Sequence, residues 1–188
     1  MENRETYPIS IAGVERNLPL FEVKPGLRIA ILNILGDVEL VDACAAELNR
    51  LLADTNYDVI LTPEAKSIPL AHMLSKVSGK PYIVLRKEYK PYLGNALSAE
   101  TLSITTGKPQ TLYLDEKDIE LIKGKRVVLL DDVISTGSTL QGLHLIMDKA
   151  GATTAREVGI LTEGDRAEWR NILSLGHLPL FFGPDKEC

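Results

Sequence analysis

Residues 127–139 constrain this chain more than any other part of its sequence. The first four, residues 127–130, are all branched and apolar, which predicts a strand buried on both faces of a sheet. Two adjacent carboxylates, Asp131 and Asp132, follow directly, and a short polar loop then leads into a predicted helix over residues 138–150. Ligands bind beyond the carboxyl ends of such strands, so this order predicts a binding site here.

The loop after the two acids has the composition of a phosphate site. It consists of Ser135, Thr136, Gly137, Ser138 and Thr139. The hydroxyl groups can donate hydrogen bonds, the glycine permits a tight turn, and the helix N-terminus offers free amides and a positive dipole end. The carboxylates would repel a phosphate, so they suit the hydroxyls of an attached sugar or a bound Mg²⁺. The stretch therefore predicts a ribose 5-phosphate site.

Other interpretations of this stretch are less well supported. An isolated Asp-Asp pair is usually a helix cap beside a turn, but the flanking strand and helix argue against that interpretation here. The chain has neither the G-x-x-x-x-G-K-[ST] pattern of nucleoside triphosphate loops nor the G-x-G-x-x-G pattern of dinucleotide sites.

Strands alternate with helices through the middle of the chain. Strands are expected over residues 27–35, 57–62, 81–85, 127–130, 158–161 and 178–182, and helices from residue 37 and over residues 68–78 and 138–150. This alternation predicts an α/β fold with a mostly parallel central sheet and helices on both faces. The polar segment 87–111 has no lasting apolar period and is expected to be a long functional loop.

Composition narrows the class of protein. The chain has 188 residues and a net charge of −5, which argues against a general nucleic-acid binder. No run of about 18 apolar residues predicts a membrane span, and the polar first residues do not form a signal peptide. The two cysteines, Cys44 and Cys188, make no disulfide framework. We therefore expect a cytoplasmic protein that binds neither nucleic acid nor membranes.

Residues 127–139 resemble the signature of type I phosphoribosyltransferases that binds phosphoribosyl pyrophosphate (PRPP), and the adenine enzymes are the most similar branch. In that family the paired acids contact the ribose hydroxyls and the following loop holds the 5-phosphate. The resemblance implies that Asp131 and Asp132 are catalytic, with Asp132 aligning the sugar, and that Ser135 to Thr139 bind the phosphate.

Two further segments resemble the pyrophosphate site of that family. Residues 62–69 resemble its short pyrophosphate loop, with Lys66-Ser67 where adenine enzymes often have Arg-Gly, and residues 86–90 resemble its Arg-Lys-x-x-Lys run. A lid over about 88–108 is expected to follow. The pyrophosphate-binding residues implied are Glu64, Ala65, Lys66, Ser67, Arg86, Lys87 and Lys90, of which Lys87 is also implied to be catalytic.

The ends of the chain resemble the small hood that covers the base in purine enzymes. A single domain over 1–188 is expected, with a core at about 36–162 and a hood at about 1–35 and 163–188. The base-binding residues implied are Val14, Val133 and Ile134.

The resemblance implies purine salvage, with adenine favoured as the base. Residues 158–162 lack the lysine that reads a 6-oxo group in many hypoxanthine–guanine enzymes. However, Thr105 stands where adenine enzymes often carry Glu, so hypoxanthine, guanine and xanthine remain open.

The resemblance also implies a homodimer, and Mg²⁺ held mainly by PRPP or pyrophosphate with no metal ligands from the protein. Two alternatives remain. One is a pyrimidine enzyme acting on orotate or uracil. The other is a non-catalytic PRPP sensor, although such regulators usually carry a separate DNA-binding domain, for which 188 residues leave no room.

Overall fold

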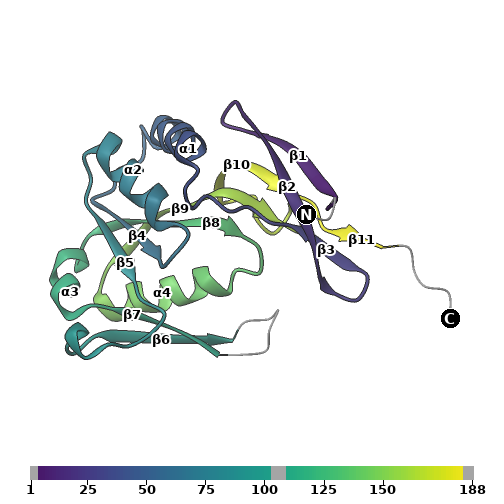
Figure 1. Ribbon diagram of the computed structural model, residues 1–188. Helices are drawn as coiled ribbons and strands as arrows, with labels where there is room; N and C mark the ends of the chain where they lie inside the picture. The colour runs from purple at the N-terminus through teal and green to yellow at the C-terminus, as the bar shows by residue number, and fades with distance from the viewer. Residues whose placement is uncertain (1–3, 103–108, 184–188) are drawn as a thin grey trace.

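A fully parallel five-stranded sheet forms the centre of the protein (Figure 1). The computed structural model describes residues 4–102 and 109–183. The strand order is β10-β9-β8-β4-β5. The bounds of these strands are β4 Val59–Pro63, β5 Tyr82–Leu85, β8 Arg126–Ile134, β9 Thr153–Glu163 and β10 Leu173–Leu178.

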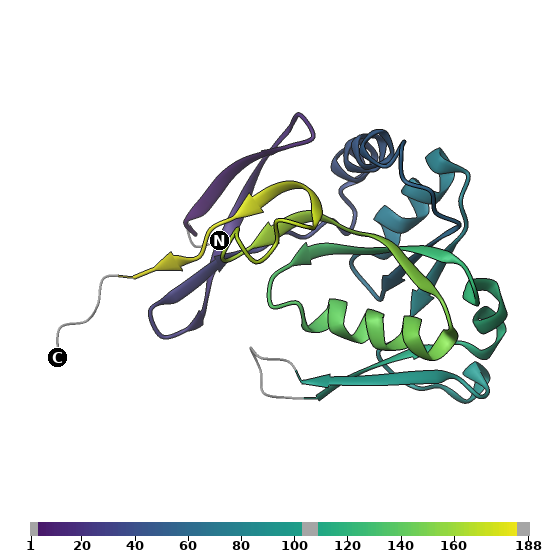
Figure 2. The same ribbon diagram turned by 180° about the vertical axis from the view of Figure 1, so that it is seen from behind.

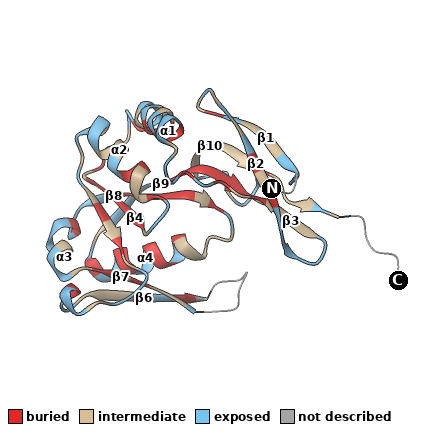
Figure 3. Ribbon diagram, in the orientation of Figure 1, coloured by how far each residue is buried: buried red, intermediate tan, exposed pale blue. Residues whose placement is uncertain are grey.

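Helices cover both faces of this sheet. Helices α1 (Val38–Leu51) and α2 (Ile68–Ser78) lie on one face, and α3 (Glu116–Ile122) and α4 (Ser138–Ala150) lie on the other (Figures 1 and 2). Alternate residues of β8 point to opposite faces. Val128 and Leu130 pack in the cluster below α1 and α2, and Val127 and Leu129 pack against α4. The central strands are accordingly the most buried part of the fold (Figure 3), which confirms the predicted α/β class.

A separate four-stranded sheet forms the hood. Its order is β1-β2-β3-β11, and each neighbouring pair is antiparallel. Its strands are β1 Thr6–Ile11, β2 Val14–Lys24, β3 Leu27–Ala30 and β11 Phe181–Phe182. Ile11 and Leu18 of the hood are buried in the same apolar cluster as Leu40 of α1. Both ends of the chain therefore build the hood, as predicted.

The segment 87–111 is more ordered than expected. A 3₁₀ turn, η1 (Pro91–Leu93), is followed by the hairpin strands β6 (Leu97–Leu102) and β7 (Pro109–Leu114). The hairpin packs on α4 and buries Ala99 and Leu112 there. The prediction of a long loop was therefore wrong for this part. Residues 103–108 of the predicted lid lie outside the described residues.

Several predicted strands have different limits, and β8 continues to Ile134 rather than ending at residue 130, so Asp131 and Asp132 belong to the strand. β3 ends at Ala30 rather than residue 35, and β9 begins at Thr153 rather than residue 158. The predicted tail strand 178–182 is divided at Pro179, which has no N–H to donate to a sheet. Leu178 ends β10, which joins the core sheet although its residues fall in the range assigned to the hood.

Helices α2 and α4 begin and end at the predicted residues. Gly79 and Gly151 follow their last turns with φ values of +70° and +67°, a left-handed conformation that glycine adopts without strain. Within the described ranges, no helix has the length and apolar character needed to cross a membrane.

Candidate functional site

Asp131 and Asp132 lie near the carboxyl end of β8 and are 8% and 6% exposed. Ser67, which comes from the loop after β4, donates its hydroxyl to Asp131 Oδ1 at 2.8 Å. The backbone N–H of Asp132 donates to Ser67 Oγ at 3.0 Å. Lys66 Nζ forms an ion pair with Asp132 Oδ2 at 2.6 Å. The two segments that the sequence assigned to pyrophosphate and ribose are therefore one connected cluster.

The two carboxylates have unequal surroundings. Burial, and then the nearby charge of Asp132, raise the pKa of Asp131 above its ordinary value, and the hydrogen bond from Ser67 opposes this shift. Asp132 Oδ2 is itself buried, and Lys66 is its sole partner among the described residues. Lys66 and Ser67 therefore supply most of the contacts that offset the cost of burying the two carboxylates.

The loop between β8 and α4 has the geometry of an anion site. Gly137 has φ +72° and precedes the first residue of α4, which is 13 residues long. The backbone N–H groups in the first turn of α4 have no hydrogen-bond partners within the helix. The hydroxyls of Thr136 and Ser138 lie 3.0 Å apart. The loop residues Ser135, Thr136, Gly137 and Thr139 line a small cavity together with Asp131, Val133 and Ile134.

Trp169, the only tryptophan of the chain, packs against this loop at Gly137. Its indole Nε1–H donates to the carbonyl oxygen of Glu163 at 2.8 Å. A Cβ atom placed on Gly137 would lie 3.1 Å from the indole ring. From sequence we expect Trp169 only to be a packing residue, and no motif signalled this contact with the loop.

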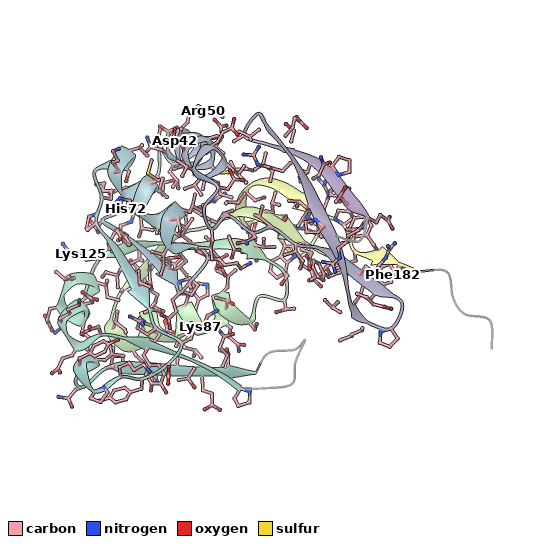
Figure 4. All side chains as sticks on the ribbon, in the orientation of Figure 1. Asp42, Arg50, His72, Lys87, Lys125 and Phe182 are labelled. Atoms are coloured by element: carbon pink, nitrogen blue, oxygen red, sulfur yellow. The ribbon has the colours of Figure 1, made fainter. Side chains whose placement is uncertain are left out.

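The predicted pyrophosphate cations follow β4 and β5, which are parallel neighbours, so both groups lie at the same edge of the sheet. Glu64 Oε1 accepts the backbone N–H of Lys87 at 2.5 Å, and Glu64 Oε2 pairs with Arg86 Nε at 2.5 Å. Lys90 pairs with Glu88 at 2.8 Å. Within the ranges that the structure covers, the side chain of Lys87 forms no ion pair, and it lies just beyond the end of β5 (Figure 4).

Comparison with known families gives this geometry its context. The model of the phosphoribosyl transferase domain matches residues 30–169, which include the acid pair, the loop between β8 and α4 and both cationic segments. The chain belongs to the phosphoribosyltransferase family. The predicted type I resemblance is confirmed.

The individual relatives of this chain differ in role. The purine biosynthesis transcriptional repressor of Bacillus subtilis (strain 168) is 26% identical over 166 residues, which are 88% of this chain and 55% of the repressor. The hypoxanthine/guanine phosphoribosyltransferase of Methanococcus voltae is 32% identical over 164 residues, which are 87% of this chain and 80% of that enzyme. The chain thus spans between about half and four fifths of these two proteins.

Solved structures support the fold. The crystal structure of adenine phosphoribosyltransferase from Thermoanaerobacter pseudethanolicus has a TM-score of 0.64 and 18% identity, and the match covers 92% of this chain and 95% of that one. At this identity the likeness concerns the architecture.

The three predicted base-binding residues do not line one cavity. Val133 and Ile134 line the small cavity of the phosphate loop, but Val14 is not among the described residues that line it. Val14 begins β2 directly after the β1–β2 turn. A larger cavity of about 370 Å³ lies between hood and core, where Leu18, Leu32 and Leu40 contribute to its wall.

That hood–core cavity adjoins the loop after β4, which the sequence predicts to bind pyrophosphate. Lys66 Nζ donates to the carbonyl oxygen of Leu32 at 3.4 Å. On the hood side, Arg16 is held by Asp37 through contacts of 2.8 Å. No sequence motif signals this ion pair, because its partners lie 21 residues apart.

Other reactive side chains lie outside this cluster. No three His, Cys, Asp or Glu side chains in the described part of the chain gather in a way that could hold a metal ion. His72 lies on α2 (Figure 4), His144 pairs with Glu157, and His177 contacts Thr162. These histidines therefore contribute contacts within the fold.

Proposed function

We propose that this protein transfers the ribose 5-phosphate group of PRPP to a nitrogen of a purine base and releases pyrophosphate. The observation that carries this proposal is the buried acid pair of Asp131 and Asp132 at the end of β8, of which Asp131 lines the same small cavity as residues 135–137 and 139. The loop would hold the 5-phosphate, and the two carboxylates would accept hydrogen bonds from the ribose hydroxyls.

The reaction would be a displacement at C1 of the ribose. The bond from the base nitrogen to C1 forms as the bond from C1 to the pyrophosphate oxygen breaks. The electron pair of the broken bond leaves with pyrophosphate, and the N–H proton of the base is released to pyrophosphate or to solvent. Such a reaction needs no covalent nucleophile from the protein. Positioning of two reactants contributes up to about 7–11 kcal/mol in favourable cases. Lys66, Arg86, Lys87 and Lys90 would stabilise the charge on the departing group.

The donor set fits Mg²⁺ that arrives with PRPP. Mg²⁺ in phosphate sites commonly keeps several waters and takes one or two carboxylates plus substrate oxygens. Asp131 and Asp132 are the carboxylates that would supply these one or two protein ligands. When bound, Mg²⁺ would neutralise charge that develops on pyrophosphate.

We propose adenine as the base, and hypoxanthine or guanine as the second candidate. Residues 158–162, which lie in the second half of β9, contain no lysine to read a 6-oxo group. The relative from Methanococcus voltae, by its name, supports hypoxanthine or guanine. The hood–core cavity of about 370 Å³ is within the usual size of small-molecule sites and is the proposed place for the base.

A PRPP-binding regulator is the second candidate role, and it is favoured by one observation. The repressor from Bacillus subtilis matches 88% of this chain. A sensor would need the phosphate loop and the acid pair for binding, but it would release no pyrophosphate.

The deciding experiment measures pyrophosphate release from PRPP and Mg²⁺ with adenine, hypoxanthine, guanine, xanthine, uracil and orotate, one at a time. We expect release with one purine. The double variant Asp131→Asn with Asp132→Asn should lower turnover about 100-fold or more. Asp42→Asn on the exposed side of α1 (Figure 4) is the matched control and should keep native turnover. If no base leads to pyrophosphate release although calorimetry shows that PRPP binds, the enzyme proposal is refuted and the PRPP-binding regulator is favoured.

A further inference from the structure

Lys66 covers the part of Asp132 that a ribose hydroxyl would need. Its Nζ lies 2.6 Å from Asp132 Oδ2, and that oxygen is buried with no other partner among the described residues. The other carboxylate oxygen, Oδ1, faces Ser67 Oγ at 3.4 Å. Because Oδ2 is buried, a side chain that encloses it must shift before a ribose hydroxyl can reach it, and Lys66 is its ion-pair partner.

We propose that Lys66 is a specificity-determining residue that makes ribose recognition depend on pyrophosphate. It holds Asp132 while the site is empty, and it transfers to a pyrophosphate oxygen when PRPP binds, which exposes Asp132 to the ribose. This inference rests on the proposed function, because it takes PRPP as the ligand of the site.

The side chain of Lys66 has room to change partners, whereas the side chain of Ser67 is fixed in the core. The side chain of Lys66 is 46% exposed, and its second contact, with the carbonyl of Leu32, is long at 3.4 Å. A lysine ammonium is a point charge on a flexible stem, so it can exchange one anion for another without a fixed geometry. Ser67 is only 1% exposed and bonds both acids through Oγ. The backbone of the loop can therefore stay in place while the lysine exchanges partners.

The exchange distinguishes PRPP from ligands that lack pyrophosphate. Removing one partner from a buried ion pair leaves an uncompensated charge, which is costly. PRPP supplies a new anion for Lys66 and hydroxyls for Asp132 in one binding event. Ribose 5-phosphate supplies the hydroxyls alone. When it binds, Lys66 would have to leave Asp132 without gaining a new anionic partner. Pyrophosphate should therefore promote binding of ribose 5-phosphate, and the effect must be reciprocal.

The test is a calorimetric titration of the full chain with ribose 5-phosphate in Mg²⁺, with and without saturating pyrophosphate. We expect pyrophosphate to tighten ribose 5-phosphate binding by about five-fold or more. Simple repulsion between two bound anions would weaken binding instead, so the sign of the effect is informative. The reverse titration, with pyrophosphate as titrant, should give the same factor.

Variants assign the coupling to Lys66. Lys66→Met should remove the coupling and bind ribose 5-phosphate alone at least as tightly as the native chain, whereas Lys66→Arg should retain part of the coupling. Lys76→Met, in the last turn of α2, is the matched control and should keep the native factor.

Three results would overturn the inference: an absent coupling in the native chain, the same coupling in Lys66→Met, or no ribose 5-phosphate binding in either condition while PRPP binds. A native chain that does not bind PRPP would instead refute the proposed function.

Discussion

Replacing Gly137 by alanine should destabilise the phosphate loop for two separable reasons. Gly137 has φ +72°, and a left-handed conformation costs about 1–2 kcal/mol for a residue with a Cβ. The new Cβ would also lie 3.1 Å from the indole of Trp169. The indole cannot retreat freely, because its Nε1–H bonds the carbonyl of Glu163 at 2.8 Å.

Gly151 at the other end of α4 is a matched control for the first reason. It has φ +67° and no atom within 4 Å of an added Cβ. Gly151→Ala should therefore show the conformational cost without the clash. Crowding a packed contact adds about 1 kcal/mol or more. We expect Gly137→Ala to lower the free energy of unfolding by about 1 kcal/mol more than Gly151→Ala, or roughly 2–4 °C in Tm.

Thermal and urea denaturation of both variants measure this difference, and PRPP calorimetry measures its effect on the site. Gly137→Ala should weaken PRPP binding, whereas Gly151→Ala should leave it unchanged. The cost of Gly137→Ala should also shrink in a Trp169→Leu background, where the indole is gone. Equal destabilisation by the two alanine variants, or an unchanged cost without Trp169, would refute the assigned contact.

Two further predictions concern charge in the site. The raised pKa of Asp131 means that the folded protein holds a proton more tightly than the unfolded chain, so stability falls as pH rises above the ordinary value of 3.8. Asp131→Asn cannot ionise and should melt a few degrees above the native chain at pH 8, with no gain below about pH 4; a gain that is equal at all pH values would contradict the cause given. Lys87→Met should raise the KM for PRPP about 10- to 100-fold, since a hydrogen bond to a charged group contributes about 1.5–3 kcal/mol. Lys125→Met at the opposite end of β8 is its control, and similar KM values for the two variants would remove Lys87 from the pyrophosphate site.

Sequence patterns predicted the core of the fold because strand and helix signals there are strong and local. Helices α2 and α4 are followed by glycines at the residues expected, and residues 127–130 of β8 are a continuous apolar run. The hairpin of β6 and β7 was missed because its inward positions include Ala99 and Thr101, which are small or polar and give no clear alternation. Its packing on α4 is a tertiary contact that a local pattern does not contain.

The candidate site was predicted as residues but not as a network. Motifs placed Lys66 and Ser67 in one segment and Asp131 and Asp132 in another, about 65 positions apart. Parallel pairing of β4 with β8 brings the segments together, and this much follows from the predicted sheet. Which side chain contacts which acid depends on rotamers, and these are set by the packed structure.

The network has a consequence for how the site should respond to substitution. Ser67 Oγ donates to Asp131 and accepts from the N–H of Asp132, so one hydroxyl fixes both acids. Residues in one hydrogen-bond and ion-pair network do not contribute independent energies. A change at Ser67 therefore also changes the environment in which Lys66 and Asp132 pair. Single substitutions at these four residues would overstate the separate worth of each, and only double-mutant cycles would divide ribose binding from pyrophosphate binding in this site.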